Sequence, residues 1–117
     1  MAGTSKEAKE ITDGLNRFFE ASPDVISAFK TMRKTICNDD GKGVIDFKTK
    51  ELIAIAVSVS RMCKPCILSH LEVGIKAGVT REELVEAVNI AILLCGGPGF
   101  AYAAYALEWY DELVKGA

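Results

Sequence analysis

What this sequence lacks already narrows its class. It has 14 Lys and Arg residues against 16 Asp and Glu, a formal net charge of −2, and no basic cluster. We therefore expect no nucleic-acid partner. The first ten residues, MAGTSKEAKE, lack the apolar core of a secretory signal. We accordingly expect a cytoplasmic protein whose four cysteines are reduced or cycle between thiol and disulfide. Structural disulfides of a secreted domain are not expected.

Repeats, linkers and low-complexity segments are absent as well. The length of 117 residues, half of them hydrophobic, predicts a single globular domain over residues 1–117. The polar segment CNDDGKG has neither the spacing of a calcium loop nor the glycines of a phosphate loop. We interpret it as a turn between helices.

One apolar run is long enough to be mistaken for a membrane span. Residues 87–107, AVNIAILLCGGPGFAYAAYAL, contain no charged side chain. The CGGPG segment interrupts this run near its middle, so we expect two buried helices that meet at a sharp turn, and no membrane span. So much apolar surface in a short chain predicts that part of it forms a subunit interface.

Hydrophobic periodicity predicts an all-α fold of about six helices. The segment LIAIAVSVS alternates like a strand, but no second strand is visible to pair with it, and we interpret it as a buried helix. Pro65 would clash with the carbonyl of Arg61 in a continuous helix, so one helix ends near residues 60–62 and another begins at the cysteines. The expected helices cover about 5–21, 23–36, 47–61, 63–77, 81–94 and 100–114.

Several local signals mark the ends of these helices. Ser22 and Asp46 are expected N-caps, and Thr80 with Glu83 forms a capping box. Gly78 is expected to end the fourth helix. The second helix carries an apolar stripe, formed by Val25, Ile26, Phe29, Met32 and Ile36. The aromatic residues of the last helix are expected to pack in the core or an interface; they are Tyr102, Tyr105 and Trp109.

The chemistry is concentrated in SRMCKPCILSH, residues 60–70. Cys66 follows Cys63 by three positions and His70 follows Cys66 by four, so all three share one face of a helix. A helix N-terminus favours thiolate over thiol, and Lys64 adds a positive charge beside the pair. His70, the one histidine of the chain, could accept or relay a proton.

Three other interpretations of the cysteine pair stay open at this point. The two thiols could be inert packing groups. They could bind zinc with His70 and a fourth ligand from Cys37 or Cys95, although the sequence has no second C-x-x-C and no H-x-H. A thioredoxin-type enzyme would need an alternating α/β pattern, which is not visible. Cys37 and Cys95 have no partner at a telling spacing, and we treat both as structural.

Glu51 extends the motif, because it lies twelve residues before Cys63 in a stretch with little other charge. The resulting pattern, E-x(11)-C-x-x-C-x-x-x-H, resembles the signature of the alkylhydroperoxidase D-like family within the carboxymuconolactone decarboxylase superfamily. The segments KELIAIAVSVSRMCKPCILSH and GIKAGVTREELVEAVNIAILLCGGP resemble the core of that family. The resemblance covers residues 47–110, with residues 1–45 forming additional N-terminal helices.

This resemblance implies an all-helical subunit that assembles into trimers or hexamers and uses no cofactor and no metal. It implies reduction of a small hydroperoxide or disulfide, with a dithiol reductant such as a thioredoxin-like or lipoyl protein. Cys66 would be the attacking thiolate and Cys63 the more exposed, resolving cysteine. Glu51 and His70 would form a proton relay; otherwise Glu51 meets only the helix dipole or solvent.

One departure from the family pattern concerns the residue before the second cysteine. Well-known peroxidases of the family have a histidine there, and this chain has Pro65. A stiff C-x-P-C turn suits disulfide exchange at least as well as peroxide reduction. Two alternative functions remain: a lactone decarboxylase, whose known members do not depend on a cysteine pair, and a non-enzymatic, zinc-stapled helical oligomer.

Overall fold

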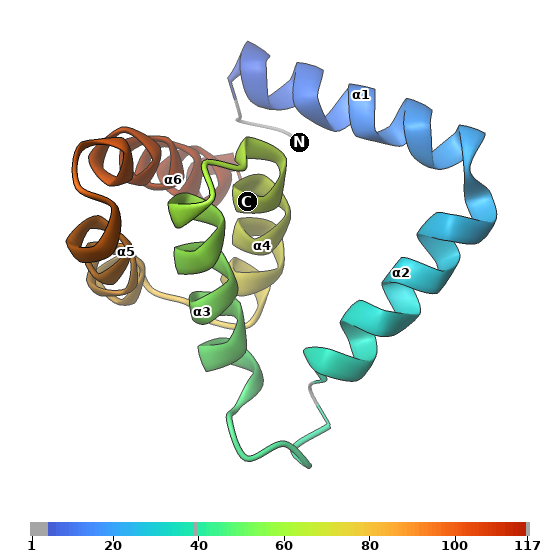
Figure 1. Cartoon of the computed structure of the whole chain (residues 1–117), viewed down its shortest axis with the longest axis horizontal. Coiled ribbons are helices and arrows are strands. Elements are labelled where there is room, and N and C mark those ends of the chain that lie inside the picture. Colours follow the sequence, from blue (N-terminus) through green and yellow to red (C-terminus); the bar gives the residue numbers. More distant parts are fainter. Residues whose placement is uncertain (1–4, 39, 117) are drawn as a thin grey trace.

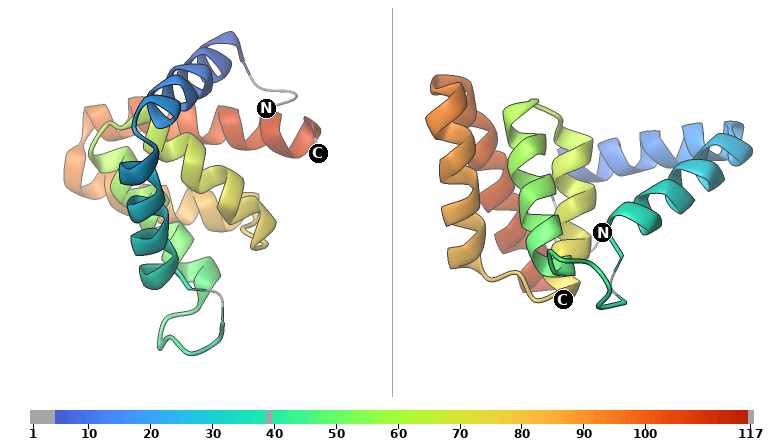
Figure 2. Two further views of the ribbon diagram at one scale, coloured as in Figure 1. Left: turned by 90° about the vertical axis from the view of Figure 1, so that its right-hand side faces the viewer. Right: turned by 60° about the horizontal axis from the view of Figure 1, so that its bottom comes forward.

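The computed structural model describes residues 5–38 and 40–116, and every regular element within them is a helix (Figure 1). The all-α prediction is therefore confirmed, and the strand-like segment lies in a helix. The helices are α1 (Lys6–Ala21), α2 (Pro23–Ile36), α3 (Phe47–Ser60), α4 (Lys64–Lys76), α5 (Arg81–Cys95) and α6 (Gly97–Gly116). Helices α3 to α6 pack into one body, and α1 and α2 form a bent arm beside it (Figure 2).

The start signals of α3 and α5 act as the sequence predicts. The Asp46 carboxylate accepts a hydrogen bond from the Thr49 N–H at 2.7 Å, and this contact with Thr49 lowers the pKa of Asp46. Thr80 and Glu83 form both bonds of the capping box. Lys48 Nζ lies 2.9 Å from Glu83 Oε2 and ties the start of α3 to the start of α5.

Ser22 lies at the N-cap position of α2, but its side chain makes no capping hydrogen bond, which corrects that expectation. Its ψ of 61° departs from the extended backbone that aims an N-cap hydroxyl at the first turn. The Ser22 N–H is also occupied at the end of α1, where it donates to the Phe19 carbonyl at 3.2 Å. One residue closes α1 and precedes α2, so the arm bends there.

The apolar run at residues 87–107 forms an α5–α6 hairpin, as expected. Helix α6 begins at Gly97 rather than near residue 100, because Pro98 is tolerated in a first helical turn, where its missing N–H would be unpaired anyway. Gly96, with φ of 70°, ends α5. No helix in the described part of the chain combines the length and hydropathy that a membrane span requires.

The core lies inside the body formed by α3 to α6. Its largest fully buried side chains are Trp109, Ile55, Ile67, Leu71, Leu84, Glu51 and Val59. Tyr102 and Tyr105 are partly buried against this core, so the packing role expected for the aromatic residues of the last helix is confirmed. From the arm, α1 contributes only Ala8 to the buried set.

The apolar stripe of α2 is helical as predicted, but none of its residues is buried within the single chain. Val25, Phe29, Met32 and Ile36 are each more than half exposed. Two polar bonds hold the end of α2 to α3: Lys50 Nζ donates to the Ile36 carbonyl at 2.9 Å and to Asn38 Oδ1 at 3.2 Å. Helix α2 therefore stands beside the body without being packed into it.

The α5–α6 hairpin offers a direct test of packing. A Cβ at Gly99 would lie 2.9 Å from Ile92 Cα, whereas a Cβ at Gly97 would meet nothing within 4 Å. We expect Gly99→Ala to destabilise the protein by about 1–3 kcal/mol, because the two helix backbones must separate. Gly97→Ala, the matched control, should leave the free energy of unfolding nearly unchanged or raise it. Denaturant titration measures both, and equal effects would contradict the tight crossing.

Candidate functional site

The site begins at the break between α3 and α4. The Cys63 N–H donates to the Ser58 carbonyl at 3.1 Å and the Met62 N–H to the Val59 carbonyl at 3.0 Å, which is a Schellman arrangement. Met62 occupies its left-handed position with φ of 55°, where glycine is usual. A non-glycine residue there carries about 1–2 kcal/mol of backbone strain. The break reverses the chain and delivers Cys63 to the start of α4.

Cys63 is the N-cap of α4, and Pro65 lies in its first turn. Cys63 and Cys66 form a disulfide across that turn, with Cα atoms 5.3 Å apart. Cys63 Sγ also accepts a hydrogen bond from the Cys66 N–H at 3.3 Å. The break, the proline and the C-x-x-C spacing together bring the two sulfurs to the first turn of α4. The predicted proximity of the two thiols is confirmed.

The relative exposure of the two cysteines differs from the expectation. Cys66 is exposed and Cys63 only partly so, whereas Cys63 was expected to be the more exposed of the two. The physical reason is that Cys63 lies in the helix break with its sulfur over the first turn of α4. Cys66, in contrast, faces a hollow between α4 and the arm.

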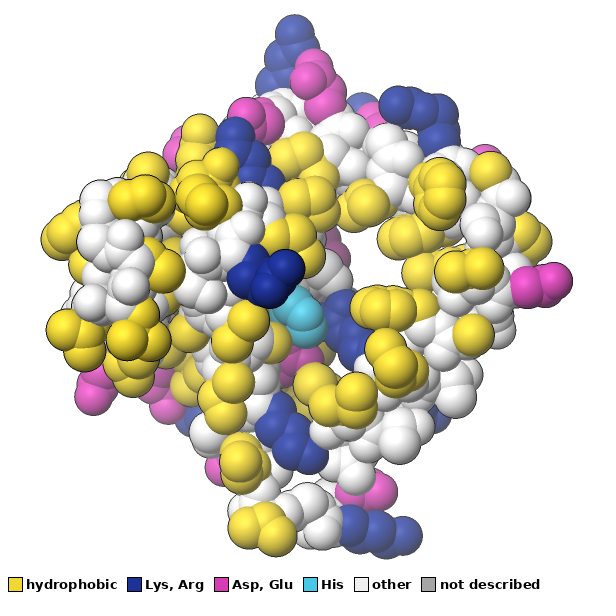
Figure 3. Space-filling view, viewed as in Figure 1, with side chains coloured by type: hydrophobic (Ala, Val, Ile, Leu, Met, Phe, Trp, Pro, Cys, Tyr) yellow, Lys and Arg dark blue, Asp and Glu magenta, His cyan; other side chains and the backbone are white. Residues whose placement is uncertain are grey.

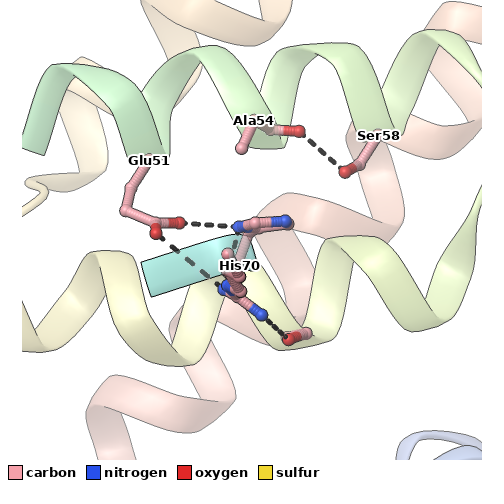
Figure 4. Close-up of polar contacts among 6 residues, drawn as sticks. Glu51, Ala54, Ser58 and His70 are labelled. Carbon is pink, nitrogen blue, oxygen red and sulfur yellow. Dashed lines mark hydrogen bonds and ion pairs between the residues drawn. The ribbon is translucent and has the colours of Figure 1, made fainter. Parts of the chain in front are cut away.

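Glu51 lies on α3 and is completely buried. Its Oε2 is 2.7 Å from His70 Nδ1 on α4, so the carboxylate and the imidazole bond across the two helices (Figure 4). A buried carboxylate is costly unless it is paired, and His70 supplies a partner. The alternative in which Glu51 meets only solvent or the helix dipole does not hold.

Sequence reasoning missed a further residue at this pair. Arg33, on α2, places Nη2 3.0 Å from His70 Nδ1 and 3.8 Å from Glu51 Oε1, while its Nη1 donates to Ser69 Oγ at 2.7 Å. A signal was present, because Arg33 follows Phe29 by four positions and so puts a cation on the apolar stripe of its helix.

A hollow of about 420 Å³ is lined by both Cys66 of the disulfide and His70, the partner of Glu51. Cys66, His70 and Arg33 line one part of it, and apolar side chains of the arm line the rest, including Phe18 and Phe29. In the space-filling view, hydrophobic side chains border this opening between the arm and the body (Figure 3). A molecule in the hollow would therefore meet Cys66 and His70 together.

Lys64, inside the C-x-P-C motif, has other partners. Its Nζ is 3.2 Å from Glu7 Oε2 and 4.2 Å from the centre of the Tyr105 ring. These contacts with Tyr105 and Glu7 raise the pKa of Lys64. The charge expected beside the cysteines thus serves to hold α1 and α6 at the start of α4.

The remaining two cysteines are free and half-buried. Cys95 Sγ lies 3.8 Å from the Ser60 carbonyl, and neither Cys37 nor Cys95 joins the pair. Over residues 5–38 and 40–116, no three His, Cys, Asp or Glu side chains converge as a metal site would require. The zinc hypothesis, which needed Cys37 or Cys95 as a fourth ligand, has no such cluster to support it.

Comparisons with known proteins find a matching family model and related sequences. The model of the carboxymuconolactone decarboxylase family matches residues 23–109. An uncharacterised protein of Cupriavidus necator is 38% identical over 103 residues, which cover 85% of this chain and 88% of that protein. An alkyl hydroperoxide reductase of Corynebacterium kroppenstedtii is 37% identical over 65 residues, covering 56% of this chain and 36% of that protein.

Solved structures show the same arrangement of helices. A carboxymuconolactone decarboxylase family protein from Legionella pneumophila superposes with a TM-score of 0.79 at 37% identity, covering 92% of this chain and 97% of the other. A family member from Thermotoga maritima gives a TM-score of 0.75 at 26% identity, with 94% and 92% covered.

The order of cysteine exposure predicts the order of alkylation. When the reduced protein meets a limiting amount of iodoacetamide, we expect Cys66 to be labelled before Cys63, because Cys66 faces the hollow and Cys63 is half-buried at the N-cap. Peptide mass mapping gives the labelled fraction of each cysteine. Denatured protein is the control and should label both at similar rates; preferential labelling of Cys63 in the native protein would contradict the assignment.

Proposed function

Because this chain belongs to the carboxymuconolactone decarboxylase family, we propose that it is the redox-active kind of member, a thiol–disulfide oxidoreductase that also reduces hydroperoxides. The observation that carries the proposal is the Cys63–Cys66 disulfide at the start of α4, where Cys66 shares a hollow with His70. A lactone decarboxylase has no use for such a pair. The family alone supports either redox or decarboxylase chemistry.

The cycle starts from the reduced pair. His70 accepts the proton of the Cys66 thiol while Glu51 holds the Nδ1 side of the ring. The Cys66 thiolate attacks the terminal oxygen of a hydroperoxide, which breaks the O–O bond, gives a sulfenic acid and releases an alcohol that takes up the proton. The Cys63 sulfur then attacks the sulfenic sulfur, forms the disulfide and releases water.

An external dithiol closes the cycle. One of its thiolates attacks the Cys63–Cys66 disulfide, and its second sulfur resolves the mixed disulfide, so the protein regains two thiols and the reductant becomes a disulfide. With a disulfide as substrate, the reduced pair runs the same exchange in the opposite sense. A thioredoxin-like or lipoyl protein has the required chemistry, and the cycle needs no metal and no cofactor.

Surface features suggest the setting of this chemistry. Two free cysteines fit a reducing compartment, and we propose that the protein works in the cytoplasm. Leu93 and Leu94 are about four-fifths exposed and Phe100 about two-thirds, and Ile90, one turn before Leu93 and Leu94 on α5, is exposed as well. An apolar surface of this kind marks an interaction site. We propose that a second copy of the chain covers it in a homo-oligomer, a trimer or hexamer.

The function is tested with variants of all the cysteines and of the relay. We expect the wild type to reduce hydroperoxide or a model disulfide with a dithiol donor, and Cys63→Ser and Cys66→Ser to fall to background. His70→Gln should lose about 10²–10⁴-fold in turnover, the usual contribution of a general acid–base. Cys37→Ser and Cys95→Ser are the matched controls and should keep activity. Lactone turnover that survives in the Cys63→Ser, Cys66→Ser double variant would favour the decarboxylase instead.

The assembly is tested separately. Leu93→Glu together with Leu94→Glu should shift the mass in solution to that of a single chain, because two charges cannot be buried unpaired in an apolar interface. Val44→Glu is the control, since Val44 is fully exposed in a loop away from the patch. Light scattering after size exclusion gives the mass, and a monomeric wild type would refute the interface.

A further inference from the structure

Arg33 touches every polar member of the relay. Within the described residues, its guanidinium is the cation nearest to Glu51, 3.8 Å from Oε1, and that oxygen has no hydrogen-bond partner although it is fully buried. The same guanidinium lies 3.0 Å from His70 Nδ1 and donates to Ser69 Oγ. The side chain crosses from α2, a helix with no buried residue, to reach this position.

The two neighbours of His70 Nδ1 make opposite demands on its proton. If Nδ1 carries a hydrogen, it donates to Glu51 Oε2 at 2.7 Å; if it has a lone pair, it accepts from Arg33 Nη2 at 3.0 Å. It cannot do both. Each of these bonds has one charged partner, so charge assistance does not separate them. The bond to Glu51 Oε2 is the shorter, and without it neither oxygen of the buried carboxylate would have a hydrogen-bond donor among the described residues. The hydrogen therefore belongs on Nδ1, and Nε2 keeps its lone pair.

The charged groups around His70 also decide whether its ring is neutral or positively charged. If His70 were the only partner of the buried carboxylate, the pair would be compensated best by a positively charged imidazolium. Arg33 supplies that positive charge from the other side, and a second cation 3.0 Å away is repelled. The charged groups facing the ring are thus Glu51 from α3 and Arg33 from α2, with Lys30 of α2 further along the same hollow.

We propose that Arg33 is a positioning residue that keeps His70 neutral with its hydrogen on Nδ1, so that Nε2 is free to take the proton of the Cys66 thiol. The last step rests on the proposed function; the state of the ring does not. The competing explanation is purely structural: Arg33 only anchors α2, as Lys50 does through the Ile36 carbonyl and Asn38.

The chain offers a clean spectroscopic test, because His70 is its one histidine. Long-range ¹H–¹⁵N spectra of protein labelled at histidine report the charge and the tautomer of that ring alone. At one fixed neutral pH, we expect the wild type to show a neutral ring protonated at Nδ1. Arg33→Gln should raise the imidazolium fraction severalfold, and Arg33→Lys should restore most of the wild-type spectrum.

Two control variants separate positioning from anchoring. Lys34→Gln removes the neighbouring charge of α2, which is exposed, and should leave the spectrum unchanged. Lys50→Gln loosens α2 without touching the relay and should also leave it unchanged. If Arg33→Gln leaves the ring as in the wild type, or if Lys50→Gln causes the same change as Arg33→Gln, the proposal is overturned.

Turnover adds a second readout that distinguishes the two proposals. In an active wild type, Arg33→Gln should lose at least about tenfold in turnover at neutral pH, part of the contribution of the general base, and Arg33→Lys should recover most of it. A wild type with the expected His70 spectrum but no cycling of the cysteine pair would count against the proposed function alone. Full turnover in Arg33→Gln would count against the role of Arg33.

Discussion

The buried carboxylate of Glu51 is the constraint on which the site depends. A charge removed from water costs several kcal/mol unless other groups compensate it. Here the compensation comes from His70 on α4 and Arg33 on α2, at 2.7 and 3.8 Å. One side chain of α3 thus contacts a residue of α4 and a residue of α2 at the same point. The hydrogen bond to Glu51 holds an imidazole that shares a hollow with Cys66.

The second element of the site is the break between α3 and α4. Its Schellman hydrogen bonds end α3, and the next residue, Cys63, already caps α4. Such a short connection leaves no freedom in where the first turn of α4 begins, so Cys66 and His70 follow at fixed positions on one face. The left-handed Met62 shows that the chain accepts local strain to make this connection short.

The arm gives the site its surroundings. Helices α1 and α2 contribute apolar side chains to the hollow in front of Cys66, while Cys66 and His70 of α4 line its other side. Apolar walls weaken the screening of charges inside, so contacts among Arg33, Glu51 and His70 count for more there than at an open surface. The apolar stripe of α2 and the apolar residues Ile90, Leu93, Leu94 and Phe100 of α5 and α6 are exposed in the single chain. The proposed second copy of the chain would bury such surfaces.

The sequence by itself determined the features that obey local rules. The caps at Asp46 and Thr80, the end of α4 at Gly78 and the boundary before Pro65 each follow from residues within one or two turns. The register of Cys63, Cys66 and His70 follows from helical geometry. The pairing of Glu51 with His70 was anticipated only through the family resemblance.

Only the tertiary structure decided the rest. Arg33 meets His70 across 37 residues, and no periodicity within either helix encodes that distance. The hollow that Cys66 faces depends on where the arm stands. The unburied stripe of α2 shows that an amphipathic pattern indicates what a helix can bury but not what covers it. Contacts between distant segments arise from packing of the whole chain, so their identity becomes visible only when the helices are placed together.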